Sequence, residues 1–484
     1  MPDKINVLFL AAEADPFVKI GGLGDVAGSL PRALNASGNV DIRLCLPFHG
    51  AIQRQAYDLR RVATFEIPHI TGNIRAEALA TEIDGLPVYL IAGTPIPADA
   101  PVYTSDPLLD GHKFTFFSLA ALELVRRLGW TLDLIHANDW HTAPALYAVS
   151  QRHDPYFLNA VLLLGLHNLP YLGVGAGPAL RGFGLEPAYD SQLPGWAQDA
   201  PLPLGLLSAD HIVAASPGYA REILTLEFGS GLHEFLSSRA DTISGILNGI
   251  DAQKWNPETD PDLASNFNAE RLNARQENKL VLLNEFGLES DPECILLVMI
   301  SRLDPQKGVD LVPEAMRQLS DLPWKLIILG TGVTSLEEEV RLLEAEFPSR
   351  VRAAIRFDAV LSHRMYAGAD ALLVPSRYEP CGLTQMIAMR YGCVPIARAT
   401  GGLKNTIKDI HHSKKGTGFL FKSASPLSLA NVTRRAIGAF NEKPIWRAMQ
   451  LEGMKQDFSW KRFARQYLQL YKRLITQKKE SSLQ

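Results

Sequence analysis

Cysteine is scarce in this sequence, and an excess of basic charge and long apolar runs are both absent. The four cysteines, Cys45, Cys294, Cys381 and Cys393, are widely spread, with no CxxC pair and no histidines at ligand spacing. This pattern indicates free thiols in a reducing compartment and argues against a structural metal. A net charge of −4 gives no electrostatic case for a nucleic-acid partner. No run of 18 or more uncharged apolar residues occurs, so no transmembrane helix is expected.

The remaining composition is that of a soluble globular protein, with 46% hydrophobic and 21% charged residues. A chain of 484 residues is too long for one ordinary core, and its length predicts two domains of roughly 200–250 residues each. The amino-terminal stretch MPDKINVLFLAAEAD lacks a basic leader, so it fits a first strand better than a secretory signal. We therefore expect a cytoplasmic protein, or one of the plastid stroma if the lineage is a plant one, although no transit peptide is present.

The first strand is predicted by the continuous apolar run from Ile5 to Ala11, which is typical of a strand covered on both faces. The glycine-rich turn of residues 21–25 follows, before a helical pattern from Val26 to Asn35. In such a turn, backbone amides and the helix dipole are placed to hold a phosphate. Lys19, just ahead of the turn, would add a mobile positive charge for a pyrophosphate.

Two further strands of the first half, Leu132 to Ala137 and Val161 to Leu166, are followed by polar residues. The first leads into H-A-N-D-W-H and the second into H-N-L-P-Y. A single histidine at the end of a strand is more often structural than functional. His141 is nevertheless a candidate ligand group, because Asp139 and Trp140 stand beside it at the carboxyl edge of the sheet.

Other parts of the first half give weaker patterns. We expect loop-rich structure from Phe48 to Glu82 and a long loop from Gly173 to Pro203, which is rich in Gly, Pro and Ala. Asp110 is expected to open a helix. It fits either a plain helix N-cap or an acid that serves a site.

The second half begins with the strand Ile295 to Ile300, which ends in S-R-L-D-P-Q-K-G. Arg302 and Lys307, five residues apart at this strand-to-helix turn, suit a diphosphate, because a guanidinium binds two oxygens and an ammonium adds a point charge. The alternative is a solvated basic turn.

The stretch 370–403 combines two strands, Ala371 to Val374 and Val394 to Ala397, with a helix from about Leu383 to Tyr391 between them. The first strand end presents the Glu379 carboxylate near a helix start. The second presents a glycine pair that a ligand could approach closely. An ordinary βαβ unit is the alternative interpretation.

Taken together, these motifs resemble a known family. The turn K-I-G-G-L-G-D, the strand end D-L-I-H-A-N-D-W-H, the segment S-P-G-Y-A-R-E-I and the loop S-R-Y-E-P-C-G-L are similar to those of the bacterial glycogen synthases and plant starch synthases. These are retaining glycosyltransferases of the GT-B type. The resemblance implies an α/β fold with two doubly wound Rossmann-like domains facing a central cleft. It implies domain boundaries at 1–247 and 248–459, with a C-terminal helix, 460–478, that crosses back onto the first domain.

The resemblance also implies a reaction: transfer of glucose from ADP-glucose to the non-reducing end of an α-1,4-glucan, with retention of configuration. The implied partners are ADP-glucose or ADP and an α-1,4-glucan or maltooligosaccharide, with no nucleic acid, membrane, metal or cofactor. The residues expected to carry catalysis are Asp110, His141, Arg302, Lys307 and Glu379. Donor binding is expected from these last three together with Lys19, Gly21, Gly22, Asp25, Cys381, Gly382, Leu383, Thr384, Gly401 and Gly402. The acceptor side is expected to include Asp139, Trp140, His167, Asn168 and Tyr171.

Three alternative functions are considered beside this one. UDP-glucose could replace ADP-glucose as donor, since the residues alone do not separate the two bases. A non-catalytic glucan-binding relative is the second alternative, because Ile20, Gly165 and Pro203 depart from the family pattern and a family lysine is missing near Pro203. An NAD-linked oxidoreductase would need G-x-G-x-x-G after a strand, and no strand here ends that way.

Overall fold

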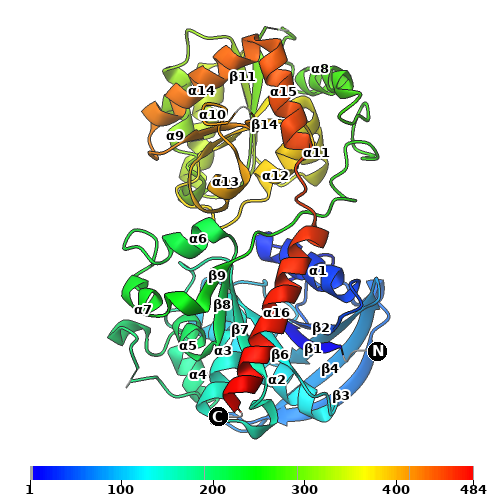
Figure 1. The fold of residues 1–484 in the computed structure, drawn as a ribbon, viewed down its shortest axis with the longest axis vertical. Coiled ribbons are helices and arrows are strands. Elements are labelled where there is room, and N and C mark those ends of the chain that lie inside the picture. Colours follow the sequence, from blue (N-terminus) through cyan, green and yellow to red (C-terminus); the bar gives the residue numbers. More distant parts are fainter. Residues whose placement is uncertain (1–3, 190, 292, 414, 483–484) are drawn as a thin grey trace. The chain divides into compact units, whose positions relative to one another are not determined.

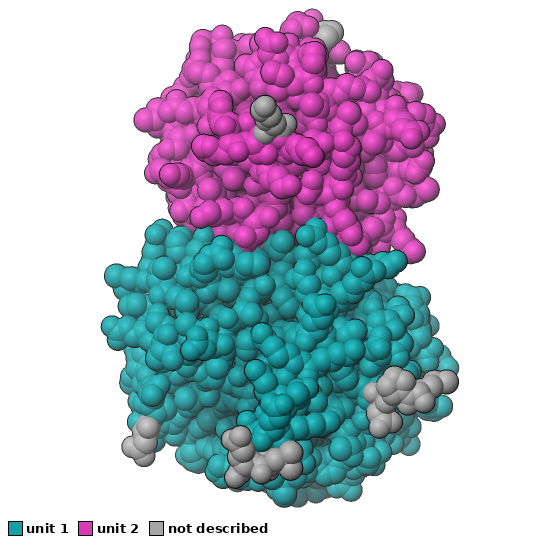
Figure 2. Space-filling view, viewed as in Figure 1, with its two compact units in different colours: residues 1–249, 460–484 teal, residues 250–459 magenta. Residues whose placement is uncertain are grey.

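The structure is a computed structural model that describes residues 4–189, 191–291, 293–413 and 415–482. It contains two compact units, coloured separately in Figure 2. Unit 1 comprises residues 1–249 and 460–484, and unit 2 comprises residues 250–459. The helix at the end of the sequence therefore belongs to the same unit as the first strand.

Unit 1 is built on a nine-stranded sheet with the order β3-β4-β5-β2-β1-β6-β7-β8-β9. Its seven parallel strands are β1 (Ile5–Leu10), β2 (Val40–Pro47), β5 (Leu86–Gly93), β6 (Leu134–Asn138), β7 (Val161–Leu166), β8 (His211–Ala214) and β9 (Ile243–Gly245). The chain order reverses between the neighbours β1 and β6. In an open parallel sheet, such a switch point is where ligands bind, outside the carboxyl ends of the strands.

The expectation of loop structure between Phe48 and Glu82 was wrong. This region forms two antiparallel strands at the edge of the sheet, β3 (Arg60–Ile67) and β4 (Ile74–Ile83). Their side chains are buried on one face only, so apolar and polar residues alternate and no continuous apolar run announces a strand. The structure also assigns two short helices to the expected loop 173–203, α4 (Gly177–Gly182) and the start of α5 (Pro201–Ser208). Each has a proline at one of its first positions, where the missing N–H costs nothing.

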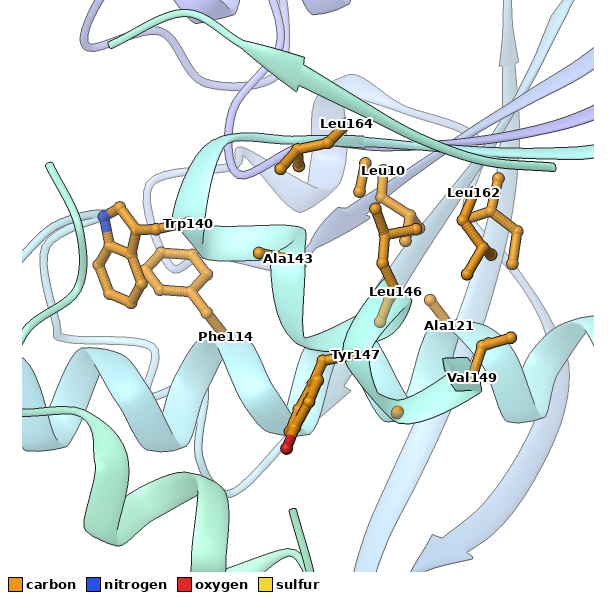
Figure 3. Close-up of a cluster of buried hydrophobic side chains, with 14 of the residues drawn as sticks. Leu10, Phe114, Ala121, Trp140, Ala143, Leu146, Tyr147, Val149, Leu162 and Leu164 are labelled. Carbon is orange, nitrogen blue, oxygen red and sulfur yellow. The ribbon is translucent and has the colours of Figure 1, made fainter. Parts of the chain in front are cut away.

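Helices cover the sheet of unit 1 (Figure 1). The longer ones are α1 (Gly22–Asn35), α2 (Pro107–Arg127) and α3 (Asp139–Gln151), with α6 (Pro217–Glu222) and α7 (His233–Ser238) later in the chain. In Figure 3, Leu146 of α3 lies beside Leu10 of the sheet, and Trp140 lies beside Phe114 of α2. These contacts belong to one large buried apolar cluster, so the helices that carry candidate site residues are fixed by the core of the unit.

The helix α16 (Trp460–Ser482), red in Figure 1, packs along unit 1 against α1. Its buried Tyr471 hydroxyl lies 2.8 Å from Nδ1 of His136 in β6. Nearer its end, Lys478 contacts both carboxylate oxygens of Asp210 at 2.9 and 3.0 Å. An apolar face and these two polar contacts therefore attach α16 to the central strands of unit 1.

Unit 2 has a six-stranded, all-parallel sheet with the order β12-β11-β10-β13-β14-β15. The strands are β10 (Ile295–Ile300), β11 (Trp324–Leu329), β12 (Val351–Ala354), β13 (Ala371–Val374), β14 (Val394–Arg398) and β15 (Phe419–Phe421). The helices are α8 (Arg275–Glu285), α9 (Leu311–Arg317), α10 (Thr334–Glu346), α11 (Ala359–Gly368), α12 (Thr384–Arg390), α13 (Gly401–Thr406), α14 (Pro426–Asn441) and α15 (Lys443–Met454). Here the switch point lies between β10 and β13. Among the residues that the structure describes, no helix is long and apolar enough to cross a membrane.

Candidate active site

The turn after β1 is organised by Glu13, a buried carboxylate that no motif in the sequence marks as functional. Glu13 accepts hydrogen bonds from the backbone N–H groups of Ile20 and Gly21, the latter at 3.0 Å. Burial raises its pKa, while the bonds from these amides and from the Tyr103 hydroxyl act in the opposite direction. The Gly21 amide, which the sequence assigned to a phosphate, is thus bonded to Glu13 in this structure.

Two other groups of this turn face outward. Lys19 is exposed, and its ammonium forms an ion pair with Asp25 at 2.6 Å. At Gly22, the first residue of α1, an added Cβ would meet no atom within 4 Å, so the backbone is open to an approaching group. An exposed lysine held by the half-buried carboxylate of Asp25 beside an open helix start is suited to exchange that carboxylate for a phosphate.

His141 follows β6 inside a cage of aromatic rings. The centroids of Trp140, Phe114 and Tyr103 lie 4.4, 4.7 and 4.9 Å from that of its imidazole. Burial lowers the pKa of His141 to about 3, with smaller contributions from Lys113 and His49. The imidazole is therefore neutral near pH 7, which suits a hydrogen bond to a hydroxyl.

Asp110 does not cap its helix. The N-cap of α2 is Asp106, whose side chain accepts from the N–H groups of Leu108 and Leu109, so the N-cap interpretation of Asp110 was wrong. Asp110 lies one turn further on, buried, and contacts the Lys113 ammonium at 2.9 Å and the Thr104 N–H at 2.9 Å. Because Lys113 also donates to the carbonyls of residues 101 and 102, this ion pair holds the loop that carries Tyr103.

The residues after β6 and β7 meet at Asp139. One of its oxygens accepts the backbone N–H groups of His167, at 2.7 Å, and Asn168, at 3.2 Å. Burial raises the pKa of Asp139, against the opposing effect of His167 and these amides. Asp139 also has a positive φ of 55°, a conformation that costs energy in a residue other than glycine and that collects at functional sites.

Three buried polar atoms beside this junction have no protein partner among the described residues: His141 Nδ1, His167 Nδ1 and Asn168 Oδ1. Native proteins rarely leave such atoms unpaired, and unpaired ones call for a specific explanation, such as a ligand or water. Of the other expected acceptor-side residues, Trp140 is buried in the core, whereas Tyr171 is 52% exposed. These three unpaired atoms lie at the switch point of unit 1, where they can form hydrogen bonds with a ligand that carries many hydroxyl groups.

In unit 2, the structure brings together two residues from separate turns. The Lys307 ammonium, after β10, lies 3.0 and 2.7 Å from the two carboxylate oxygens of Glu379, after β13. Ser376 donates a hydrogen bond of 2.9 Å to the same carboxylate, which is 7% exposed. The lysine and carboxylate that the sequence assigned to one donor are therefore direct neighbours at this switch point.

Arg302 is more exposed than Lys307. Its guanidinium contacts Asp304 at 3.1 Å and Gln306 at 3.4 Å, both in its own turn. A guanidinium anchored along one edge retains other N–H donors for a ligand.

The glycines of unit 2 allow close contact between turns. The Gly402 N–H donates to the Glu379 carbonyl at 3.0 Å, and a Cβ on Gly402 would lie 2.1 Å from the Cys381 carbonyl oxygen. Its neighbour Gly401 adopts a positive φ of 44°.

The loop that follows Glu379 is fixed in a similar way. Gly382 has a positive φ, and Gln385 donates to its carbonyl at 2.8 Å. Cys381 is buried, and Leu383 and Thr384 are half-buried at the start of α12. These hydrogen bonds and close backbone contacts therefore hold the loop of residues 379–384, which begins with Glu379, in one conformation.

One group in unit 2 has the composition of a metal site, formed by Asp260, Asp262 and His363. One oxygen of Asp260 is engaged with His363 Nδ1, at 2.6 Å, and with the Tyr391 hydroxyl. Burial would raise the pKa of Asp260, but these hydrogen bonds and one from its own loop lower it. The observed contacts are those of a hydrogen-bonded structural cluster, and the expectation that catalysis needs no metal stays a prediction.

Sequence reasoning missed Glu13 and Tyr103. An acid one turn beyond the first strand, ahead of the Lys19 turn, was the available signal for Glu13. Tyr103 lies in the irregular proline-rich segment after β5, where no periodicity pointed to it.

Comparison with known proteins agrees with this geometry. The family described as "Starch synthase catalytic domain" matches residues 6–238, and "Glycosyl transferases group 1" matches residues 284–438. A sucrose-phosphate synthase from Thermosynechococcus elongatus has a similar fold, with a TM-score of 0.64 at 18% identity. These family matches, together with two α/β units built on largely parallel sheets, define a glycosyltransferase of the GT-B class.

Proteins with a higher sequence identity to this chain identify the family within this class. The glycogen synthases of Thermotoga maritima and of Anaeromyxobacter sp. strain Fw109-5 are 38% and 39% identical, each covering 97% of this chain and 99% of the relative. The catalytic domain of starch synthase IV from Arabidopsis thaliana, bound to ADP and acarbose, superposes with a TM-score of 0.89 at 34% identity, covering 98% of this chain and 100% of that one. The chain belongs to the glycogen synthase family, and its activity is that of a glycogen or starch synthase.

Proposed function

We propose that this enzyme transfers glucose from ADP-glucose to the non-reducing end of an α-1,4-glucan, with retention of configuration and without a metal or cofactor. The observation that carries the proposal is the contact between Lys307 and Glu379 at the switch point of unit 2. A cation for the phosphates and a carboxylate for sugar hydroxyls are there placed side by side. The ADP and acarbose bound to the similar starch synthase IV structure support the choice of donor and acceptor.

In the proposed reaction, the bond between the glucosyl C1 and the β-phosphate oxygen breaks, and ADP leaves with the electron pair. A new bond forms between C1 and an acceptor hydroxyl, whose proton is released. In unit 2, Arg302 and Lys307 stabilise the negative charge that develops on ADP. In unit 1, Lys19 and the open Gly22 amide are the groups suited to a phosphate. Cationic groups fixed in place before the reaction are an effective means of stabilising such charge.

We assign the binding of sugar hydroxyls to Glu379 in unit 2 and, in unit 1, to His141. The Glu379 carboxylate, held by Lys307 and Ser376, still has lone pairs to accept hydroxyl hydrogen bonds. The neutral imidazole of His141, with its unpaired buried nitrogen, can also hydrogen-bond a hydroxyl. Asp110 acts indirectly, because its ion pair with Lys113 holds the loop that carries Tyr103. On the acceptor side we place the junction of Asp139 with His167 and Asn168, together with exposed Tyr171.

A direct test is transfer of radiolabelled glucose to maltooligosaccharides of defined length, with ADP-glucose and UDP-glucose assayed in parallel. We expect products lengthened by single glucose units, and a higher kcat/KM with ADP-glucose. A higher kcat/KM with UDP-glucose would overturn the donor assignment. Glucan binding without transfer from either donor would favour the non-catalytic alternative.

The cytoplasmic location expected from the sequence also stays a proposal. It is supported by the four cysteines, all of which are buried free thiols in the structure.

A further inference from the structure

Lys307 and Glu379 sit on different turns, and Arg377 connects the two. Its backbone N–H donates to the Gln306 carbonyl at 2.8 Å, and its guanidinium donates to the Pro305 carbonyl at 2.7 Å. These acceptors immediately precede Lys307 in the chain. Arg377, two residues before Glu379, is therefore hydrogen-bonded to the turn that carries Lys307.

The same guanidinium forms a two-pronged ion pair with Asp310. Two of its nitrogens lie 2.7 Å from the two carboxylate oxygens, and this contact lowers the pKa of Asp310 and raises that of Arg377. Exposed ion pairs contribute little on average, but a bidentate pair has a fixed geometry. Asp310 directly precedes α9, so Arg377 is oriented by the rigid start of a helix.

Close backbone packing completes the joint. Gln306 donates its side-chain amide to the Tyr378 carbonyl at 3.3 Å. At Gly308, where φ is 67°, an added Cβ would lie 2.3 Å from the Pro375 carbonyl oxygen. The guanidinium of Arg398, at the end of β14, donates to the Arg377 carbonyl. The turns after β10, β13 and β14, three neighbouring strands of the sheet, are therefore connected to one another around Arg377.

We propose that Arg377 and Asp310 are positioning residues that set the Lys307 ammonium against the Glu379 carboxylate. This inference rests on the proposed function of that pair. Neither residue needs to touch the donor. Each acts on the rate by holding a cation and a carboxylate at the separation that the departing diphosphate and the sugar require. Small displacements of such groups are costly, since a shift of about 1 Å can cost about 100-fold in rate.

The test is kinetic. Arg377→Lys, which keeps the charge but loses the planar fork, should lower kcat by about 10- to 100-fold with little change in the KM for ADP-glucose. Asp310→Asn should behave in the same way. The matched control is Arg434→Lys, because Arg434 makes an equivalent pair with Asp321 in the same unit, at 2.8 and 3.1 Å, away from the Lys307 turn. The control should keep wild-type kcat.

A double-mutant cycle separates positioning from a general loss of structure. In a Lys307→Ala background, Arg377→Lys should change kcat by no more than about twofold, because the group that it positions is gone. A further 10- to 100-fold loss there would overturn the proposal, as would wild-type kcat in Arg377→Lys itself. Calorimetric titration with ADP should give the wild-type stoichiometry for each variant. Absence of transfer by the wild-type enzyme would instead refute the proposed function.

Discussion

Lys307 is the residue on which most of the proposed chemistry depends. Lys307→Ala and Arg302→Ala should each lower kcat/KM for ADP-glucose by about 10²- to 10⁴-fold, because both stabilise charge that develops as ADP departs. Steady-state kinetics with ADP-glucose and a maltooligosaccharide would measure this. Arg317→Ala is a suitable control, since that arginine makes an exposed pair with Glu346 in the same unit. Wild-type turnover in both site variants would remove this turn from the active site.

Glu13 is the second residue whose substitution we expect to change the kinetics. Glu13→Gln replaces a charged acceptor of the Ile20 and Gly21 amides by a neutral one, and hydrogen bonds to charged groups contribute about 1.5–3 kcal/mol. We expect kcat/KM for ADP-glucose to fall by about 10- to 100-fold, because the Lys19 turn loses its anchor.

Glu66→Gln provides the comparison, because Glu66 is exposed and bonds only to an asparagine side chain among the hydrogen bonds described for it. Equal kinetics for Glu13→Gln, Glu66→Gln and the wild type would mean that Glu13 does not position the turn.

At the scale of the element, buried parallel strands were the most predictable part of the fold. The strands β7, β10 and β13 have the expected first and last residues, because a strand covered on both faces is a continuous apolar run. The pattern Ser335-x-x-Glu338 is typical of a capping box, but α10 begins at Thr334, its N-cap is Val333, and no side chain caps it.

The candidate site was predictable to a similar degree. Motifs located the residues at strand ends, because the chemistry of a βα turn is local. Their partners were not predictable, since Lys307 and Glu379 are 72 residues apart and meet only through the order of the strands. The Glu13 contact likewise depends on the path of a loop, and no periodicity in the sequence describes that path.

The attachment of α16 gives a prediction about stability. Tyr471→Phe removes the hydrogen bond to His136 and leaves a buried ring nitrogen unpaired, which costs roughly 1–3 kcal/mol. Scanning calorimetry should show a lower Tm, with unit 1 affected first. Tyr156→Phe, at an exposed position of the same unit, should leave Tm unchanged. A Tyr471→Phe protein with the wild-type Tm would mean that the contact contributes nothing to stability.

At the scale of the whole molecule, the two units should respond differently to acid. Burial lowers the pKa of His49 and His211 to about 4 and of His136 and His141 to about 3, and all four lie in unit 1. Below pH 6.5 the unfolded chain binds protons that the folded unit excludes, so stability is lost as pH falls from 6.5 to about 4 for His49 and His211 and to about 3 for His136 and His141. For His49 alone the difference corresponds to about 3 kcal/mol.

In unit 2 the lowered pKa of Asp260 acts at more acid pH, because its contribution is lost only below the ordinary aspartate value of about 3.8. Calorimetry between pH 7.5 and 4.5 should therefore show the unit 1 transition moving to lower temperature while that of unit 2 changes less. His49→Gln should reduce the pH dependence of the first transition. Parallel movement of both transitions, or an unaltered slope in His49→Gln, would contradict this assignment.

The return of α16 to unit 1 also sets an order of events during protein synthesis. Domains generally fold as they leave the ribosome, the amino-terminal one first. Here every residue of unit 2 is made before residue 460, so the surface of α1 and β7 that α16 covers stays bare while unit 2 folds. The unit that is begun first is consequently completed last, and the nascent chain carries an uncovered apolar face throughout the synthesis of residues 250–459.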